Sequence, residues 1–398
     1  MLRIDENIDL YRYEIHSLVK AFYPAEDVKV LVENDPVSEK TRREHPDVFM
    51  KVSMERDRIA LQISGTGEKG DDFLRSLPAS SGADYSAKCK ETKDALKSFL
   101  YQTLSEYTGT ELPWGDLIGI RPTKIAMTRM EAGSSEAEAI DFLEKEHKVS
   151  EEKAHLAVDI AKREKRILSG IHYENGYSLY IGIPFCPTTC LYCSFPSFNI
   201  ALWKERIGEY LDALEREMAE TAELMKGQIL DTVYIGGGTP TSLESEELDR
   251  LCCAIERYFD MSTVQEFTVE AGRPDSITRE KLQALRKHPI TRISVNPQTM
   301  KEETLKIIGR HHTVQQVVDT FRMARECGFD NINMDLILGL PGEDAEDVRR
   351  TTEKVRELNP DSLTVHSLAI KRASRLRRVI DEKGYPVLIN TDETMEIA

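Results

Sequence analysis

The stretch YSLYIGIPFCPTTCLYCSF, residues 177–195, joins a predicted strand to a loop that contains three cysteines. Its first seven residues are rich in aromatic and β-branched side chains, which favour a strand. Cys186, Cys190 and Cys193 then follow with the spacing C-x3-C-x2-C. In folds built on parallel sheets with helical crossovers, the functional residues sit in the loops after the strands. The stretch therefore predicts a functional loop directly after the first strand of such a sheet.

The sequence that follows this stretch alternates between short strand patterns and helical patterns. Apolar residues recur at helical spacing from Thr313 to Gly328, and Ser245 is expected to be the N-cap of another helix. Six such β–α alternations without hairpin signals predict a parallel sheet. We therefore predict an α/β fold, a partial (β/α)6 barrel over residues 171–370. Its strands are expected at residues 177–183, 231–237, 266–271, 292–296, 331–338 and 361–368.

The first 170 residues have a different pattern. Residues 1–110 contain the strand pattern DVKVLVE and a hairpin pattern around Glu55–Asp57, which predict a small α/β domain. Residues 111–170, which include LPWGDLIGIRPTKIA, are interpreted as a helical connector. Helices are expected at residues 84–108, 134–147 and 150–169.

Residues 371–398 are interpreted as the start of a C-terminal region. Asn390 and Glu393 have the spacing of a capping box, which predicts that a helix begins there. The sequence stops after about eight further residues, shorter than a usual helix, so we expect this region to be incomplete.

Composition and charge narrow the classes of protein that the chain can represent. Of its 398 residues, 31% are charged and 40% are hydrophobic, the balance of an ordinary soluble globular protein. A formal net charge of −16 argues against a nucleic acid as the main partner, because proteins that bind polyanions present basic surfaces. No apolar run approaches the ~18 residues of a membrane span, and the first residues carry charges instead of an apolar signal. We therefore expect a cytoplasmic protein, in which clustered thiols stay reduced and act as ligands.

The three thiols of the loop suit one kind of metal centre best. A structural zinc site uses four ligands, whereas a [4Fe–4S] cluster held by three thiolates keeps one iron open to an outside ligand. Two alternatives stay open, a redox pair of Cys190 and Cys193 and a zinc site completed by a distant histidine. The other cysteines are expected to be structural, because a buried cysteine behaves as a small hydrophobic residue. They are Cys89, Cys252, Cys253 and Cys327.

A second loop, at residues 236–240 after the second predicted strand, reads GGGTP. Glycines lack a Cβ atom, so backbone groups there can approach a ligand closely. The wider sequence GGGTPTSL lacks the Gly-Lys-Ser/Thr ending with which a P-loop holds phosphate. A simple tight turn is the other alternative. Because both loops follow strands of one parallel sheet, we expect them at the same edge of that sheet.

Taken with these loops, the pattern C-x3-C-x-aromatic-C, with Tyr192 before the last cysteine, resembles the signature of the radical S-adenosylmethionine (SAM) superfamily. The resemblance implies a [4Fe–4S] cluster whose open iron binds the amino and carboxylate groups of SAM, with Tyr192 near the adenine. Within the superfamily the chain is similar to the oxygen-independent coproporphyrinogen III oxidase family, in particular its HemZ-type branch. The similar segments span roughly residues 110–380 and include GIRPTKIA, YIGIPFC, YIGGGTPTSL and NMDLILGLPGE.

This resemblance implies two sets of SAM-binding residues, by their positions in the matching motifs. Tyr180, Gly237 and Glu270 would surround the cluster-bound SAM, with the Glu270 carboxylate accepting from its ammonium group. Asp335 would bind ribose hydroxyls and Arg310 a carboxylate. The positions that the oxidases use for a second SAM are Gly238, Thr239, Gln298, Arg310, Asp335 and Ala369.

The implied reaction is a radical decarboxylation. A reduced cluster gives one electron to SAM, and the resulting 5′-deoxyadenosyl radical takes a hydrogen atom from a propionate of coproporphyrinogen III. Loss of carbon dioxide and an electron leaves a vinyl group, and two such events give protoporphyrinogen IX. The implied partners are this porphyrinogen and a reductant such as flavodoxin or ferredoxin. Cations expected to bind the tetra-anionic substrate are Arg121, Lys124, Lys371 and Arg372.

A haem-binding chaperone of the same family is the alternative function. Gly182 and Phe195 stand where the oxidases proper have a histidine and a further cysteine, which puts the oxidase assignment in question. His311 and His312 are adjacent and could ligate haem, although histidines beside a helix start usually face solvent. RNA modification is a third class, and the net charge of −16 argues against it.

Overall fold

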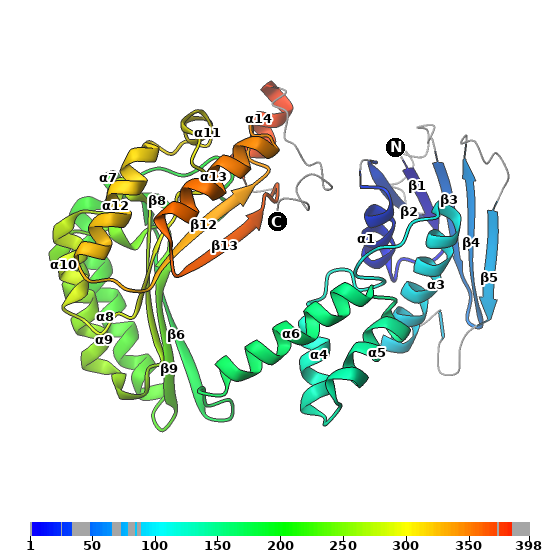
Figure 1. Cartoon of the computed structure of the whole chain (residues 1–398), viewed down its shortest axis with the longest axis horizontal. Coiled ribbons are helices and arrows are strands. Elements are labelled where there is room, and N and C mark those ends of the chain that lie inside the picture. Colours follow the sequence, from blue (N-terminus) through cyan, green and yellow to red (C-terminus); the bar gives the residue numbers. More distant parts are fainter. Residues whose placement is uncertain are drawn as a thin grey trace. The chain divides into compact units, whose positions relative to one another are not determined.

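The computed structural model describes residues 2–24, 26–33, 48–65, 73–78, 84–85, 89–371 and 374–383. They form two compact units, Met1–Ser169 and Gly170–Ala398 (Figure 1). The predicted capping box at Asn390 and Glu393 lies outside the described residues. Within the described part of the chain, no helix is both long enough and apolar enough to cross a membrane.

The first unit contains a five-stranded sheet with the strand order β2-β1-β3-β4-β5. Its elements are β1 (Leu2–Glu6), α1 (Arg12–Phe22), β2 (Val28–Val32), β3 (Val48–Met54), β4 (Arg58–Gly65), β5 (Phe73–Pro78) and α3 (Lys90–Thr108). β1 is parallel to both neighbours, whereas β3, β4 and β5 pair antiparallel, so the hairpin predicted around Glu55–Asp57 is confirmed. Alternation along β3 buries Met50 and Val52 in one core with side chains of α1 and α3.

Three further helices complete the first unit and have a core of their own. They are α4 (Pro122–Glu131), α5 (Glu136–His147) and α6 (Glu151–Leu168). Ser135 caps α5 in a capping box with Glu138, and the Ser150 hydroxyl accepts from the Lys153 amide at the start of α6. The helices predicted at 134–147 and 150–169 are therefore confirmed. A boundary between a domain at 1–110 and a connector at 111–170 stays a prediction.

The second unit is built on a six-stranded sheet in the order β13-β12-β11-β10-β9-β6, in which every pairing is parallel. The sheet is curled, and helices flank its outer face (Figure 1). This is the predicted partial (β/α)6 barrel, and each of the six predicted strands lies within two residues of the observed one. The strands are β6 (Gly176–Ile183), β9 (Ile229–Gly237), β10 (Glu266–Gly272), β11 (Arg292–Val295), β12 (Ile332–Leu338) and β13 (Ser362–Ser367).

Helices connect these strands and bury one face of the sheet. Ile235, Val269 and Ile293 of the sheet share a core with Leu251 and Phe321 of the helices. Because side chains alternate along a strand, the residues between these apolar ones face the concave side. Besides short 3-10 turns, the described part of this unit also contains β7 (Phe185–Cys186), β8 (Phe198–Asn199), α7 (Ile200–Trp203), α8 (Ile207–Leu224), α9 (Ser245–Tyr258), α10 (Arg279–Arg286), α11 (Glu302–Ile307), α12 (Val314–Glu326), α13 (Ala345–Leu358) and α14 (Arg375–Lys383).

Three expectations about single residues need correction. Ser245 is the first residue of α9 and not its N-cap, since Glu244 occupies that position and forms a capping box with Glu247. A carboxylate can accept the exposed amides and also suits the positive end of the helix dipole. Cys253 is exposed and therefore not a buried structural thiol, whereas Cys252 is fully buried. His312, expected to face solvent, is only 2% exposed.

Candidate active site

The cysteine loop follows β6 and is tied to other loops at the same edge of the sheet. The amide of Leu191 donates to the Ile308 carbonyl at 2.9 Å, and the Leu191 carbonyl accepts from Leu376 of α14 at 2.9 Å. The Thr188 hydroxyl donates to the Gly309 carbonyl at 3.3 Å. Two distant segments of the second unit, residues 308–309 and the start of α14, therefore fix the course of the loop.

The three thiols of the loop influence one another. Burial raises the pKa of Cys186 and of Cys193, and the Cys190 thiol raises both further. Among the described residues, the sulfur atoms of Cys186, Cys190 and Cys193 do not form a group in which all three atoms lie within 4.8 Å of one another. A cluster of several irons suits a wider spacing, because each thiolate binds a different iron.

Two buried guanidinium groups lie beside Cys190. Arg273 is 3% exposed, and its Nη1 lies 3.9 Å from the Cys190 Sγ and 2.9 Å from the Thr188 Oγ1. Its other edge pairs with Asp275 at 2.7 Å. Arg310 is 6% exposed and lies near Cys190. Two cations within reach of one thiol favour an anionic group at this place.

The glycine loop after β9 packs directly against the cysteine loop. Gly237 has φ +108°, a conformation that strongly favours glycine, and a Cβ there would lie 2.9 Å from the Ile183 amide nitrogen. A Cβ at Gly238 would lie 2.9 Å from the Cys186 Sγ. The Thr239 hydroxyl lies 3.5 Å from the same sulfur. The glycines thus let two chain segments meet where any side chain would intrude.

Carboxylates and tyrosines lie on the concave face below these loops. Tyr180 of β6 stacks on Tyr234 of β9, with ring centroids 5.8 Å apart, and Tyr234 lies beside Glu270 of β10. Burial, followed by the charge of Asp335, raises the pKa of Glu270 to about 7. Asn333 donates to the Asp335 Oδ1 at 2.7 Å. A half-buried carboxylate with so high a pKa is one that a cationic ligand would ionise.

Gln298 adopts a backbone conformation that is uncommon for residues other than glycine. Its φ is 67°, which costs of the order of 1–2 kcal/mol. Its amide donates to the Asp335 carbonyl at 2.9 Å, and its carbonyl accepts from the Ile337 amide at 3.0 Å. Strain held by surrounding hydrogen bonds is typical of functional sites.

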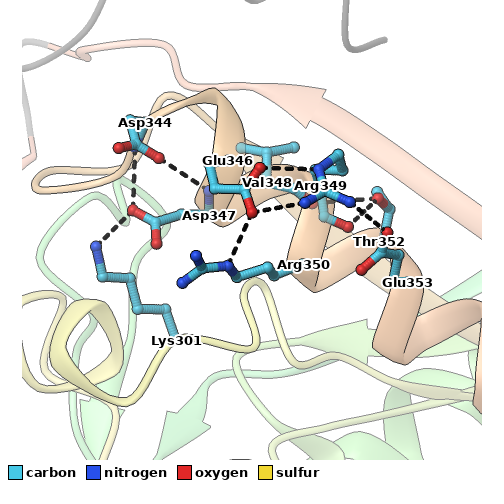
Figure 2. Close-up of polar contacts among 9 residues, drawn as sticks. All are labelled: Lys301, Asp344, Glu346, Asp347, Val348, Arg349, Arg350, Thr352 and Glu353. Atoms are coloured by element: carbon cyan, nitrogen blue, oxygen red, sulfur yellow. Dashed lines mark hydrogen bonds and ion pairs between the residues drawn. The ribbon is translucent and has the colours of Figure 1, made fainter.

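The loop that contains Gln298 is anchored to the start of α13. Lys301 pairs with Asp347 at 2.5 Å, and Asp347 also forms the capping box of this helix with Asp344 (Figure 2). The buried hydroxyl of Thr299 donates to Glu343. These contacts hold the strained loop in register with β12, so that Gln298 and Asp335 stay adjacent.

The structure brings most of the predicted SAM-binding residues to this edge of the sheet. Tyr192 lies beside Arg310 and packs against Leu305, Ile308 and Leu340. Ala369 follows β13 and is exposed. The predicted substrate-binding cations Arg121 and Lys124 are exposed residues of the first unit, Lys371 is exposed in the second, and Arg372 lies outside the described residues.

These residues fit a [4Fe–4S] cluster bound by three thiolates. Such a cluster carries a net negative charge, and Arg310 and Arg273 supply buried positive charge beside Cys190. Among the described residues, the Arg310 Nε is buried without a hydrogen-bonding partner, so this guanidinium retains a free donor. Gly238 leaves room beside Cys186 that a Cβ would fill.

Sequence reasoning missed two residues of this site. Arg273 stands one residue beyond β10, and its place just after a strand was the signal that could have revealed it. Tyr234 was interpreted as an ordinary strand residue, although its alternation with Val233 and Ile235 puts it on the polar face with Tyr180.

The pattern of the radical SAM superfamily matches residues 180–355, which include all three cysteines and the glycine loop. This segment, a little under half of the chain, is therefore a radical SAM domain. A [4Fe–4S] cluster and SAM are the cofactors that the match implies, in agreement with the fit of the cysteine loop.

Relatives within the superfamily carry names of two kinds. The oxygen-independent coproporphyrinogen-III oxidase-like protein HemZ of Bacillus subtilis (strain 168) is 43% identical over 293 residues, 73% of this chain and 58% of HemZ. The heme chaperone HemW of the same strain is 40% identical over 195 residues, 49% of this chain and 51% of HemW. The solved structure of coproporphyrinogen III oxidase (HemN) from Escherichia coli, a radical SAM enzyme, has a TM-score of 0.51 at 30% identity, covering 58% of this chain and 54% of HemN. This chain thus spans little more than half the length of these three proteins.

Proposed function

We propose that the protein is a radical SAM oxidoreductase that converts propionate side chains of coproporphyrinogen III to vinyl groups. The observation that carries the proposal is the junction of the cysteine loop with a polar concave face on which Glu270, Asp335 and Gln298 converge. The similarity to HemZ and to HemN directs the proposal to porphyrinogens.

When bound, the cluster and SAM supply a one-electron reduction that yields a radical able to take hydrogen from an unactivated carbon. Each propionate then loses a hydrogen atom, carbon dioxide and one electron, which leaves a vinyl group. A one-electron donor, such as reduced flavodoxin or ferredoxin, supplies the electron that cleaves SAM, and the oxidised form of such a carrier accepts the electron that the substrate radical loses with carbon dioxide.

The chain's own residues bind and orient SAM in this proposal. The Glu270 carboxylate accepts from the ligand's ammonium group, and the ion pair offsets the burial that raises the pKa of Glu270. Arg310, with its free Nε, donates to a carboxylate. Asp335 uses Oδ1 to accept from Asn333 and keeps Oδ2 for a hydroxyl.

A haem chaperone is the second candidate, and two observations favour it. Gly182 and Phe195 replace the histidine and cysteine that the oxidases have at these positions, and Phe195 is 71% exposed. A protein named heme chaperone is 40% identical over half of this chain.

One experiment separates the two candidates. Anaerobically reconstituted protein is incubated with reductant, SAM and coproporphyrinogen III, and the products are measured by chromatography and mass spectrometry. The oxidase predicts 5′-deoxyadenosine together with a decarboxylated porphyrinogen. Asp335→Asn should reduce both products, whereas Asp330→Asn, a matched change at an exposed aspartate before β12, should not. Stoichiometric haem binding without substrate-dependent 5′-deoxyadenosine would favour the chaperone.

A further inference from the structure

A cysteine, an aspartate and a histidine converge in the helical layer of the second unit, apart from the site described above. Asp249 and Cys253 are four residues apart on α9, so their side chains lie on one face of that helix. His288 follows α10, which packs against α9. One ligand atom from each residue lies within 4.8 Å of the other two.

The distances already resemble those of a metal site. The His288 Nε2 lies 3.3 Å from the Asp249 Oδ1. Two nitrogen or oxygen ligands, each about 2.0–2.1 Å from a tetrahedral zinc ion, are separated by roughly 3.3–3.4 Å. A thiolate, an imidazole and a carboxylate form a ligand set that zinc binds readily.

A fourth residue orients the histidine. The Glu256 Oε1 lies 2.6 Å from the His288 Nδ1, so the carboxylate holds the proton on Nδ1 and leaves Nε2 free to bind a metal. Histidines that ligate metals commonly donate their second nitrogen to a carboxylate in this way. His288 is 7% exposed, which keeps the ring in this orientation.

We propose that Asp249, Cys253 and His288 bind one divalent transition-metal ion of the zinc class, with Glu256 as a positioning residue. Cys253 is exposed, so the ion can enter from solvent and water can occupy a fourth coordination position. Lys287 lies 3.5 Å from the Asp249 Oδ1, but its side chain is 67% exposed and can turn away at little cost. The alternative is a plain ion-pair network of His288 with two carboxylates, which needs neither a metal nor Cys253.

The test uses the full chain with its iron–sulfur cluster in place, so that Cys186, Cys190 and Cys193 are already ligated. Equilibrium dialysis against zinc, with metal analysis, should give one zinc ion per chain in addition to the cluster iron. X-ray absorption at the zinc edge should detect one sulfur ligand and two or three nitrogen or oxygen ligands. Circular dichroism verifies that each variant is folded.

The variants separate the metal site from the ion-pair network. Cys253→Ser, at an exposed position, should abolish one-to-one zinc binding at micromolar zinc, and His288→Gln should do the same. Glu256→Gln should weaken the zinc affinity roughly 10–100-fold. Cys327→Ser, a matched change at a thiol outside the triad, should leave the affinity unchanged. Absence of zinc from the wild-type protein, or zinc retained in both Cys253→Ser and His288→Gln, would overturn the proposal.

Discussion

Replacing Glu270 by glutamine should weaken SAM binding and at the same time stabilise the ligand-free protein. Burial and the neighbouring Asp335 raise the pKa of Glu270 to about 7, so the ionised carboxylate is energetically unfavourable until a cation pairs with it. Glutamine keeps the size of the side chain and an oxygen acceptor, but it removes the charge. The two effects therefore have opposite signs and one physical cause.

The loss of affinity follows from the lost charge. A hydrogen bond to a charged group contributes about 1.5–3 kcal/mol, which corresponds to a roughly 10–150-fold weaker affinity for SAM in Glu270→Gln. The wild-type affinity should also depend on pH. With a pKa of about 7, the ionised fraction of Glu270 rises from about one tenth at pH 6 to about one half at pH 7, so binding tightens about fivefold. The variant should lack this dependence.

The gain in stability has a defined pH window. The folded-state pKa of Glu270 lies above its usual value of 4.5, so this carboxyl favours the folded state below pH 4.5 and loses that contribution as pH rises through about 7. At pH 8 this half-buried carboxyl is ionised, and its burial then destabilises the folded wild-type protein. Glu270→Gln should therefore raise the free energy of unfolding of the ligand-free protein at pH 8 by up to about 3 kcal/mol.

Calorimetric titration of SAM into cluster-loaded protein between pH 6 and pH 8 measures the affinity, and denaturant unfolding at pH 8 measures the stability. Glu266→Gln is the matched control, since Glu266 stands at the opposite end of β10. Wild-type affinity in Glu270→Gln, or a wild-type affinity that does not change with pH, would show that this carboxylate does not bind the ligand's cation. A variant that is less stable at pH 8 would refute the electrostatic reasoning itself.

Three further substitutions test the loops around this carboxylate. Gly237→Val should lose affinity for SAM and thermal stability but keep its iron, because the new Cβ would lie 2.9 Å from the Ile183 amide nitrogen and a φ of +108° disfavours any side chain. Calorimetry, a thermal melt and iron analysis measure these three properties. Thr299→Val should lower the free energy of unfolding by about 1–3 kcal/mol, because Glu343 loses the hydroxyl that donates to it; unchanged denaturant unfolding would contradict this. Gln298→Gly should raise stability by up to about 1 kcal/mol by relieving a φ of 67°, yet weaken SAM binding through loss of the side chain; a less stable variant would argue against strain.

The barrel could be predicted closely because its strands are marked by local pattern. Five of the six, β6 and β9 to β12, have apolar residues packed in one core with the helices, and the loops that follow contain residues whose chemistry can be recognised from sequence, such as Cys186 and Gly237. In β13, by contrast, Leu363 and Val365 are exposed. The fold of the first unit was harder to predict from the sequence. In β1 the charged residues Arg3 and Asp5 alternate with buried Leu2 and Ile4, which obscured a strand whose pairing partners lie far along the chain.

The site itself was only partly predictable, because several of its properties arise from contacts between distant segments. The pKa of Glu270 depends on its burial and on Asp335, and the place of Arg273 beside Cys190 depends on its hydrogen bonds with Thr188 of the cysteine loop. Outside this site, the exposure of Cys253 likewise could not be predicted from its apolar neighbours on α9. Such properties belong to the folded arrangement and not to any one stretch of sequence.

The central claim is that Cys186, Cys190 and Cys193 hold a [4Fe–4S] cluster with one iron open to SAM. Electron paramagnetic resonance of the dithionite-reduced, anaerobically reconstituted protein, recorded with and without SAM, tests it most directly. We predict the signal of one reduced [4Fe–4S] cluster, a change in its g-values when SAM is added, and no signal when the three cysteines are replaced together by alanine. A spectrum that SAM leaves unchanged, or a cluster signal that survives the triple substitution, would contradict the claim.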